Sequence, residues 1–99
     1  MDNAVGPVLR MAEDIPGIIA AIEEDNPGTE IEVLDRGSYV RIQGGERLTV
    51  TRESIARNVG RSDYELRELE VLLASFAGRI NNTTDAITWH YTRSSPERR

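Results

Sequence analysis

The chain has 99 residues, of which 17 are acidic and 12 basic, so its net charge is −5, and it contains no cysteine. A chain of this length fits one domain, because two independent cores would be too small. The lack of cysteine excludes disulfides, thiolate zinc sites, iron–sulfur clusters and thiol nucleophiles. The negative charge disfavours sequence-independent binding to nucleic acid, which depends on Lys and Arg neutralising phosphates.

The N-terminal segment Met1–Pro7 has no basic region followed by an apolar stretch, so no secretory signal is expected. The longest apolar run, Ile18–Ile22, is far shorter than the ~20 residues that span a bilayer. We therefore expect a soluble cytoplasmic protein that makes no contact with a membrane.

The first elements are predicted to be a strand and a helix. Val5–Arg10 suits a short strand, which Pro7 should confine to a sheet edge because proline lacks an N–H donor. Asp14 suits the N-cap of a helix with Pro16 in its first turn, and Asn26–Gly28 should end it. One face of this helix carries an apolar stripe made of Ile15, Ile18, Ile19 and Ile22.

The middle of the chain is predicted to be extended. Period-2 alternation marks three strands, at Ile31–Val33, Tyr39–Gln43 and Arg47–Val50. Arg36–Ser38 forms the first turn, and Gly44–Gly45 is typical of a tight hairpin between the second and third strands. Thr51 then caps a helix from Arg52 to Val59 that ends at Gly60.

The last third is predicted to hold a short helix and a hairpin. Ser62–Glu65 has the pattern of a capping box, and Glu70–Leu73 looks extended again. A final hairpin joins two strands through Asn81–Thr84, and these strands are Phe76–Ile80 and Ala86–Tyr91.

The order β-α-β-β-β-α-α-β-β predicts a single small α+β domain with mostly antiparallel sheets and two to three helices. We expect this domain to cover residues 1–92, with a flexible arm at residues 1–5. Residues 93–99 should form a disordered tail.

Catalytic and metal-binding patterns are missing from the sequence. His90 is the only imidazole, and alternation with Trp89 places it on the solvent face of its strand. The acidic clusters at Glu23–Asp25 and Glu65–Glu70 contain no Glu-x-x-His and no calcium-loop spacing, so solvated helix faces account for them best. No Gly-x-Ser-x-Gly turn supports a serine nucleophile. We expect no catalytic residue, no metal site and no bound cofactor.

Two segments carry large donor-rich side chains on predicted strands, namely Asp35–Ile42 and Ser75–Ile80. Such side chains on a sheet are typical of a surface that holds another macromolecule. A structural interpretation stays equally open, in which Tyr39, Arg41 and Arg79 pack along the sheet and pair with acids such as Glu30 or Glu32.

Several segments in one register resemble a known family over about Asn3 to Tyr91. They are Val5-Gly6-Pro7, Asp25-Asn26-Pro27-Gly28, Asp35-Arg36 with Tyr39-Val40-Arg41-Ile42, Leu48-Thr49 with Thr51-Arg52, and Glu68-Leu69-Glu70 with Ala74-Ser75-Phe76-Ala77-Gly78. Together they resemble the coupling, or effector, proteins of bacterial soluble diiron monooxygenases. The similarity is greatest to the subgroup that serves toluene and alkene (including isoprene) hydroxylases.

The resemblance implies a cofactor-free, non-catalytic protein, monomeric when free, that docks on the hydroxylase α-subunit above its diiron site. It would remodel the active site and couple electron transfer and O2 activation to hydroxylation or epoxidation. A reductase and a Rieske-type ferredoxin would supply the electrons. We place the hydroxylase contact on a set of nine residues, namely Asn3, Val5, Arg10, Arg36, Tyr39, Arg41, Ser75, Phe76 and Arg79.

Two other functions remain as alternatives. A small-molecule-sensing regulatory α+β domain would need an apolar cleft, which the low aromatic content of 5% makes difficult to build. An RNA-recognition sheet is disfavoured by the net charge of −5 and by the missing aromatic-rich pattern of such sheets.

Overall fold

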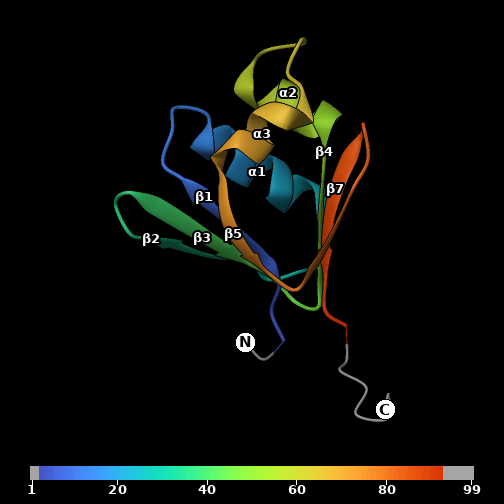
Figure 1. The fold of residues 1–99 in the computed structure, drawn as a ribbon. Helices are drawn as coiled ribbons and strands as arrows, with labels where there is room; N and C mark the ends of the chain where they lie inside the picture. The colour runs from blue at the N-terminus through green and yellow to red at the C-terminus, as the bar shows by residue number, and fades with distance from the viewer. Residues whose placement is uncertain (1–2, 93–99) are drawn as a thin grey trace.

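The structure is a computed structural model that describes residues 3–92 (Figure 1). Its strands and helices follow one another along the chain as β1 (Gly6–Arg10), α1 (Ile15–Asp25), β2 (Glu32–Asp35), β3 (Tyr39–Gln43), β4 (Arg47–Thr51), α2 (Arg52–Val59), α3 (Leu66–Leu72), β5 (Leu73–Ala77), β6 (Arg79–Asn82) and β7 (Ala86–His90). The predicted tail at residues 93–99 lies outside the described residues.

The strands form two antiparallel sheets. One has four strands in the order β2-β3-β1-β5, and the other has three strands in the order β4-β7-β6. The two sheets diverge like the arms of a V, with α1 between them and with α2 and α3 across the open end (Figure 1). This arrangement confirms the predicted α+β class with antiparallel sheets.

The core lies inside the V. From α1, the buried side chains are Ile15, Ile18, Ala21 and Ile22, while Ile19 of the predicted stripe is only partly buried. The sheets contribute Leu9, Val40, Ile42, Leu48, Val50, Ile87 and Trp89, none of them more than 1% exposed. Each Å² of apolar surface that folding removes from water contributes about 25 cal/mol to the free energy of folding, so this core is a main source of stability. No helix among residues 3–92 is long and apolar enough to cross a membrane.

Two predictions for the strands in the first half of the chain were wrong. β1 is not an edge strand, because it lies between β3 and β5. Its pairing with β3 begins at Val8, so the missing N–H of Pro7 removes no bond to that neighbour. Gly44–Gly45 closes no hairpin either, because β3 and β4 belong to different sheets. Instead Val5 exchanges backbone hydrogen bonds with Gly44, and the chain passes from one sheet to the other.

The short third helix also differs from its prediction. Its N-cap is Glu65 rather than Ser62, because the Glu68 carboxylate accepts a hydrogen bond from the Glu65 N–H at 3.1 Å. The helix then continues to Leu72 through the segment expected to be extended. The predicted strand Phe76–Ile80 is divided at Gly78, so that β5 joins the four-stranded sheet and β6 joins the three-stranded sheet.

Glycines allow the two sheets to approach each other at the vertex of the V. Gly6 has φ +148°, and a Cβ atom there would overlap the carbonyl oxygen of Ile42. Gly78 has φ +95°, and its Cβ would lie 2.6 Å from Val5 Cγ1 and 2.8 Å from the carbonyl oxygen of His90. Both positions combine a left-handed backbone with close contact, so they require glycine. The angle between the sheets therefore depends on these two residues.

Asp25 fastens the end of α1 to the start of α2. Its carboxylate accepts hydrogen bonds from the Thr51 N–H at 2.8 Å, the Thr51 hydroxyl at 3.1 Å and the Ser54 hydroxyl at 2.7 Å. Thr51 is the predicted N-cap of α2, and its hydroxyl oxygen accepts from the Ser54 N–H at 3.1 Å. The expectation that Glu23–Asp25 is only a solvated acidic cluster was thus wrong for Asp25.

The neighbouring Asn26 covers the open edge of the three-stranded sheet. Its amide donates to the Thr49 carbonyl at 2.7 Å and accepts from the Thr49 N–H at 3.0 Å, as a neighbouring strand would. An unpaired strand edge is a site of unwanted association, and this amide protects β4 at that point. The turn that ends α1 therefore also completes the sheet beside it.

We expect Asp25→Ala to lower the free energy of unfolding by about 3 kcal/mol, because it leaves three donors without their charged acceptor. Urea unfolding followed by the fluorescence of the buried Trp89 measures this change. Glu23→Ala is the matched control, since it removes the same charge from an exposed position on the same helix. Equal effects of the two substitutions would contradict the proposed fastening role.

Gly6→Ala should destabilise the domain by about 3 kcal/mol or more, because the added methyl group forces the two sheets apart at the vertex. Gly45→Ala provides the comparison, since a Cβ at Gly45 meets no atom within 4 Å. Thermal unfolding should show a melting temperature that falls by at least about 10 °C for the first variant and by about 3 °C or less for the second. A Gly6→Ala domain as stable as the Gly45→Ala domain would refute the close-approach argument.

Candidate functional site

Most of the predicted docking residues meet on the outer face of the four-stranded sheet. Cross-strand partners lie on the same face, and the registers align Leu34, Arg41, Val8 and Ser75 in one row across β2, β3, β1 and β5. The next row pairs Tyr39 with Arg10. The inward-facing neighbours on β1 and β3 are core residues, so alternation directs these rows to the surface.

A shallow hollow of about 620 Å³ lies over these rows. We call it the outer hollow, and its lining residues are Val8, Leu34, Arg36, Tyr39, Arg41, Gln43, Ala74 and Ser75. The apolar side chains of the outer hollow belong to residues that are not part of the core cluster. Tyr39 is 47% exposed at its margin. A firm apolar floor with Arg and Tyr around it is the composition of protein-binding surfaces.

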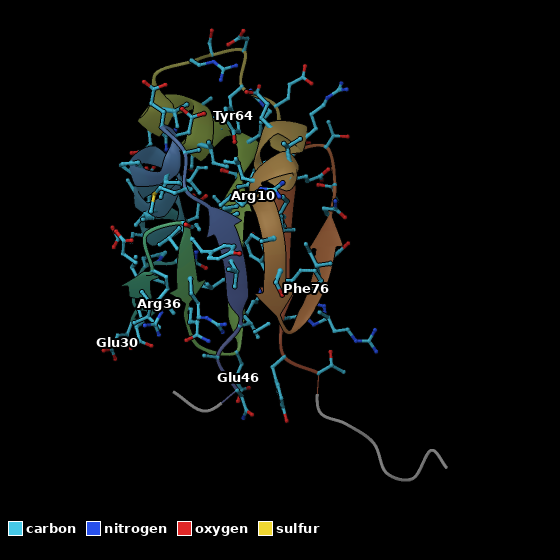
Figure 2. The ribbon with its side chains drawn as sticks, turned by 60° about the vertical axis from the view of Figure 1, so that its left-hand side comes forward. Arg10, Glu30, Arg36, Glu46, Tyr64 and Phe76 are labelled. Carbon is cyan, nitrogen blue, oxygen red and sulfur yellow. The ribbon has the colours of Figure 1, made fainter. Side chains whose placement is uncertain are left out.

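The arginines of the outer hollow have no partner within residues 3–92. Arg36 and Arg41 form neither an ion pair nor a side-chain hydrogen bond there, so the alternative pairing with Glu30 or Glu32 is not observed. Arg10 is different, because its guanidinium donates to the carbonyl oxygen of Val71 at 2.6 Å. Figure 2 shows Arg10 at the upper end of β1, beside the junction of α3 and β5.

At the helical end of the molecule, by contrast, the charged side chains form ion pairs with one another. Arg61 pairs with Glu68 at 2.8 Å and with Asp63 at 3.4 Å, and its guanidinium lies 5.5 Å from the centre of the Tyr64 ring. The hydrogen bond from Arg61 lowers the pKa of Glu68 below its ordinary value. Burial raises the pKa of Tyr64 to about 12. These contacts fix the connection between α2 and α3.

Glu24 continues this compensation on α1. It pairs with Arg57 and accepts from the Asn58 amide at 2.9 Å, and the Asn58 hydrogen bond is the main reason that its pKa lies below the ordinary value. Both partners are on α2, so the contact joins the two helices across the open end of the V. The acidic end of α1 is therefore used inside the molecule.

Besides Arg10, which borders the outer hollow without lining it, four of the predicted docking residues lie elsewhere. Val5 is 1% exposed and belongs to the core, where its N–H bonds to the carbonyl oxygens of Gly44 and Gly45. Asn3 is exposed at the vertex and donates to Glu46 at 3.3 Å. Phe76 pairs with the inward-facing Pro7 and is 38% exposed near the lower end of β5 (Figure 2). Arg79 lies on β6, in the other sheet.

Other lining residues were missed by the sequence analysis. Val8, Leu34, Gln43 and Ala74 were not predicted as surface contacts, although they line the hollow between the predicted Arg and Tyr positions. Val8, Leu34 and Ala74 are apolar residues that look like ordinary strand sequence, so the strand pairing is needed to place them at the hollow. Alternation with the apolar Leu9 would have indicated Val8, and alternation along Tyr39–Gln43 would have indicated Gln43.

The site has no arrangement suited to chemistry of its own. Over residues 3–92, no group of three His, Asp or Glu side chains lies close enough together to hold a metal ion. His90 is half-buried, and its only side-chain hydrogen bond among these residues is with the Thr92 hydroxyl at 3.4 Å. What the outer hollow presents is an apolar floor with guanidinium donors and a tyrosine around it.

Comparison with known proteins agrees with the resemblance seen in the sequence. The chain is 39% identical over 90 residues to the effector subunit of the alkene monooxygenase system of Xanthobacter autotrophicus strain Py2, which covers 91% of this chain and 88% of the relative. It is similar to a chain of a phenol hydroxylase–regulatory protein complex, with a TM-score of 0.75, 26% identity and coverage of 90% and 98%.

The fold alone is shared with the regulatory protein B of soluble methane monooxygenase, at a TM-score of 0.66 and 22% identity, covering 93% of this chain and 67% of that one. The model of the MmoB/DmpM family matches residues 3–90. These similarities make the chain a regulatory component of a multicomponent monooxygenase rather than a catalytic one. With nearly all of its described residues matched, the chain belongs to the MmoB/DmpM family.

Proposed function

We propose that this effector acts in the cytoplasm by docking the outer hollow on the diiron hydroxylase of its system, on the α-subunit surface that covers the diiron site. The observation that carries the proposal is the exposed Tyr39 beside Arg36 and Arg41, two arginines that have no partner within residues 3–92 and lie over an apolar floor. The similar chain in the phenol hydroxylase–regulatory protein complex supports a hydroxylase as the partner.

The shape of the hollow suits a rigid contact. Stable protein interfaces bury about 1,600 Å² in total, and their energy is concentrated in a few Tyr, Trp and Arg side chains. The outer hollow offers Tyr39 and Arg41 on a paired strand and Arg36 in the turn that precedes it, so the backbone of these residues loses little conformational entropy on binding. Arg10 is already fixed by the Val71 carbonyl and would contribute shape more than charge.

Docking can remodel the hydroxylase only through a difference in affinity. The effector shifts the hydroxylase towards its active conformer by as much as it binds that conformer better than the resting one. A preference of about 2.7 kcal/mol changes the equilibrium a hundredfold. A few anchoring contacts from the outer hollow can supply this amount.

The consequence would be coupled turnover. With the active conformer favoured and its active site covered, electrons from a reductase and a Rieske-type ferredoxin would be used for hydroxylation or epoxidation of an aromatic or alkene substrate. Closing the site also excludes water and limits side reactions. The effector itself supplies no reacting group in this scheme, because its role is to bind and to hold a conformation.

Tyr39→Ala together with Arg41→Ala should raise the effector concentration that gives half-maximal hydroxylase activity by about tenfold or more, because both anchors are lost. The measurement is substrate turnover against effector concentration, with purified hydroxylase and its electron-transfer proteins. Activity at saturating effector should approach that of the unchanged protein.

Arg67→Ala serves as the control, since it removes an exposed arginine that pairs only with the nearby Glu65 at the helical end. It should leave the titration unchanged. The fluorescence of Trp89 confirms that each variant is folded. Identical titration curves for the double variant and for Arg67→Ala would rule out the outer hollow as the docking surface.

A further inference from the structure

A row of basic side chains crosses the outer face of the three-stranded sheet. The strand registers pair Arg79 of β6 with His90 of β7, and His90 with Arg47 of β4. The adjacent row, made of Ile80, Trp89 and Leu48, faces the core. Alternation therefore places the basic row on the opposite, outward face.

Folding gives no reason for this row. Arg47 and Arg79 stand in one row with His90 between them, and two like charges in one row add nothing to the stability of a sheet. Within residues 3–92, neither Arg47 nor Arg79 forms an ion pair or a side-chain hydrogen bond, and no carboxylate compensates the row. By contrast, Arg57, Arg61 and Arg67 each have a carboxylate partner. The chain has more acidic than basic residues, with a net charge of −5, yet within residues 3–92 no acidic side chain pairs with this row.

The rest of this face is polar and neutral. The next outward row consists of Thr49, Thr88 and Asn81, in which the two threonine hydroxyls lie 3.1 Å apart. The outer face thus lacks the apolar floor of the outer hollow. A contact made by this face alone depends on charge and hydrogen bonds, so it should be weak and sensitive to salt.

The geometry of the row suits carboxylates. Strands lie about 4.8 Å apart, so the row spans about 10 Å from Arg47 to Arg79. Alternate residues of an extended acidic segment are about 7 Å apart, which lets two carboxylates meet the row at once. Arginine binds carboxylates in a bidentate manner. Nucleic acid fits less well, because the net charge of −5 repels a long chain of phosphates.

We propose that the outer face of the three-stranded sheet is a second docking surface, which takes a carboxylate-rich segment of a partner protein through Arg47, His90 and Arg79. This surface goes beyond the hydroxylase contact proposed for the outer hollow. The two outer faces lie on opposite arms of the V (Figure 1), so occupation of one leaves the other open.

The test is a titration of the isotope-labelled full chain with a hexaglutamate peptide at low salt, followed by nuclear magnetic resonance. We expect shifts at the start of β4, the start of β6 and the end of β7, with little change around Tyr39 and Arg41. Arg47→Ala with Arg79→Ala should weaken binding at least fivefold. Salt at about 0.3 M should remove most of the binding, because it screens exposed charges.

Arg57→Ala with Arg67→Ala is the matched control, since it changes the net charge equally at the helical end. Equal weakening by the two double variants, or no weakening by either, would overturn the proposal, because binding would then follow net charge or residues 93–99. A thymidine hexanucleotide is the second probe. Tighter binding of this probe to the same row would also overturn the proposal, in favour of a nucleic acid partner.

Discussion

The isoleucine face of α1, wedged between two sheets, is the constraint on which the rest of the structure depends. Because α1 fills the V, the inner faces of both sheets are buried against it in the core. Asp25 and Asn26 fix the end of this wedge to α2 and to the edge of β4. Gly6 and Gly78 fix the opposite end, where the sheets touch. Both outer faces are thereby held as firm surfaces.

The distribution of charge follows from the same arrangement. The helices close the open end of the V, and there Arg57, Arg61 and Arg67 are balanced by carboxylates on neighbouring elements. On the outer faces of the sheets, no such ion pair forms within residues 3–92, although Glu32 lies beside the row of Leu34 and Arg41. Within residues 3–92, guanidinium groups without a partner occur on the sheets at Arg41, Arg47 and Arg79, and in the turn between β2 and β3 at Arg36. An acidic protein overall can therefore present basic surfaces locally, and these give specificity to its encounters.

The sequence predicted what is local and missed what depends on pairing. Pro16 and the isoleucine stripe identified α1, Thr51 and Gly60 delimited α2, and Arg36–Ser38 gave the turn between β2 and β3. Gly44–Gly45 has the composition of a hairpin turn, but Val5 takes the backbone groups that a hairpin would use. In the same way, Arg41 and Arg79 show the same alternation, although β3 and β6 belong to different sheets. Period-2 alternation shows that a side chain leaves the core, but it does not show from which sheet.

Two outer faces with different chemistry suit two kinds of contact. The outer hollow combines an apolar floor with Tyr39 and two arginines. Burial of the apolar floor can therefore add to the attraction between charges and slow the dissociation of a bound partner. The basic row on the three-stranded sheet has only charge and hydrogen-bonding groups, so its contacts should form and break quickly. An effector without reactive groups can influence catalysis only through the binding free energies that its surfaces provide. Lasting contact through one face would hold a hydroxylase conformation, while brief contact through the other would let a second partner come and go during turnover.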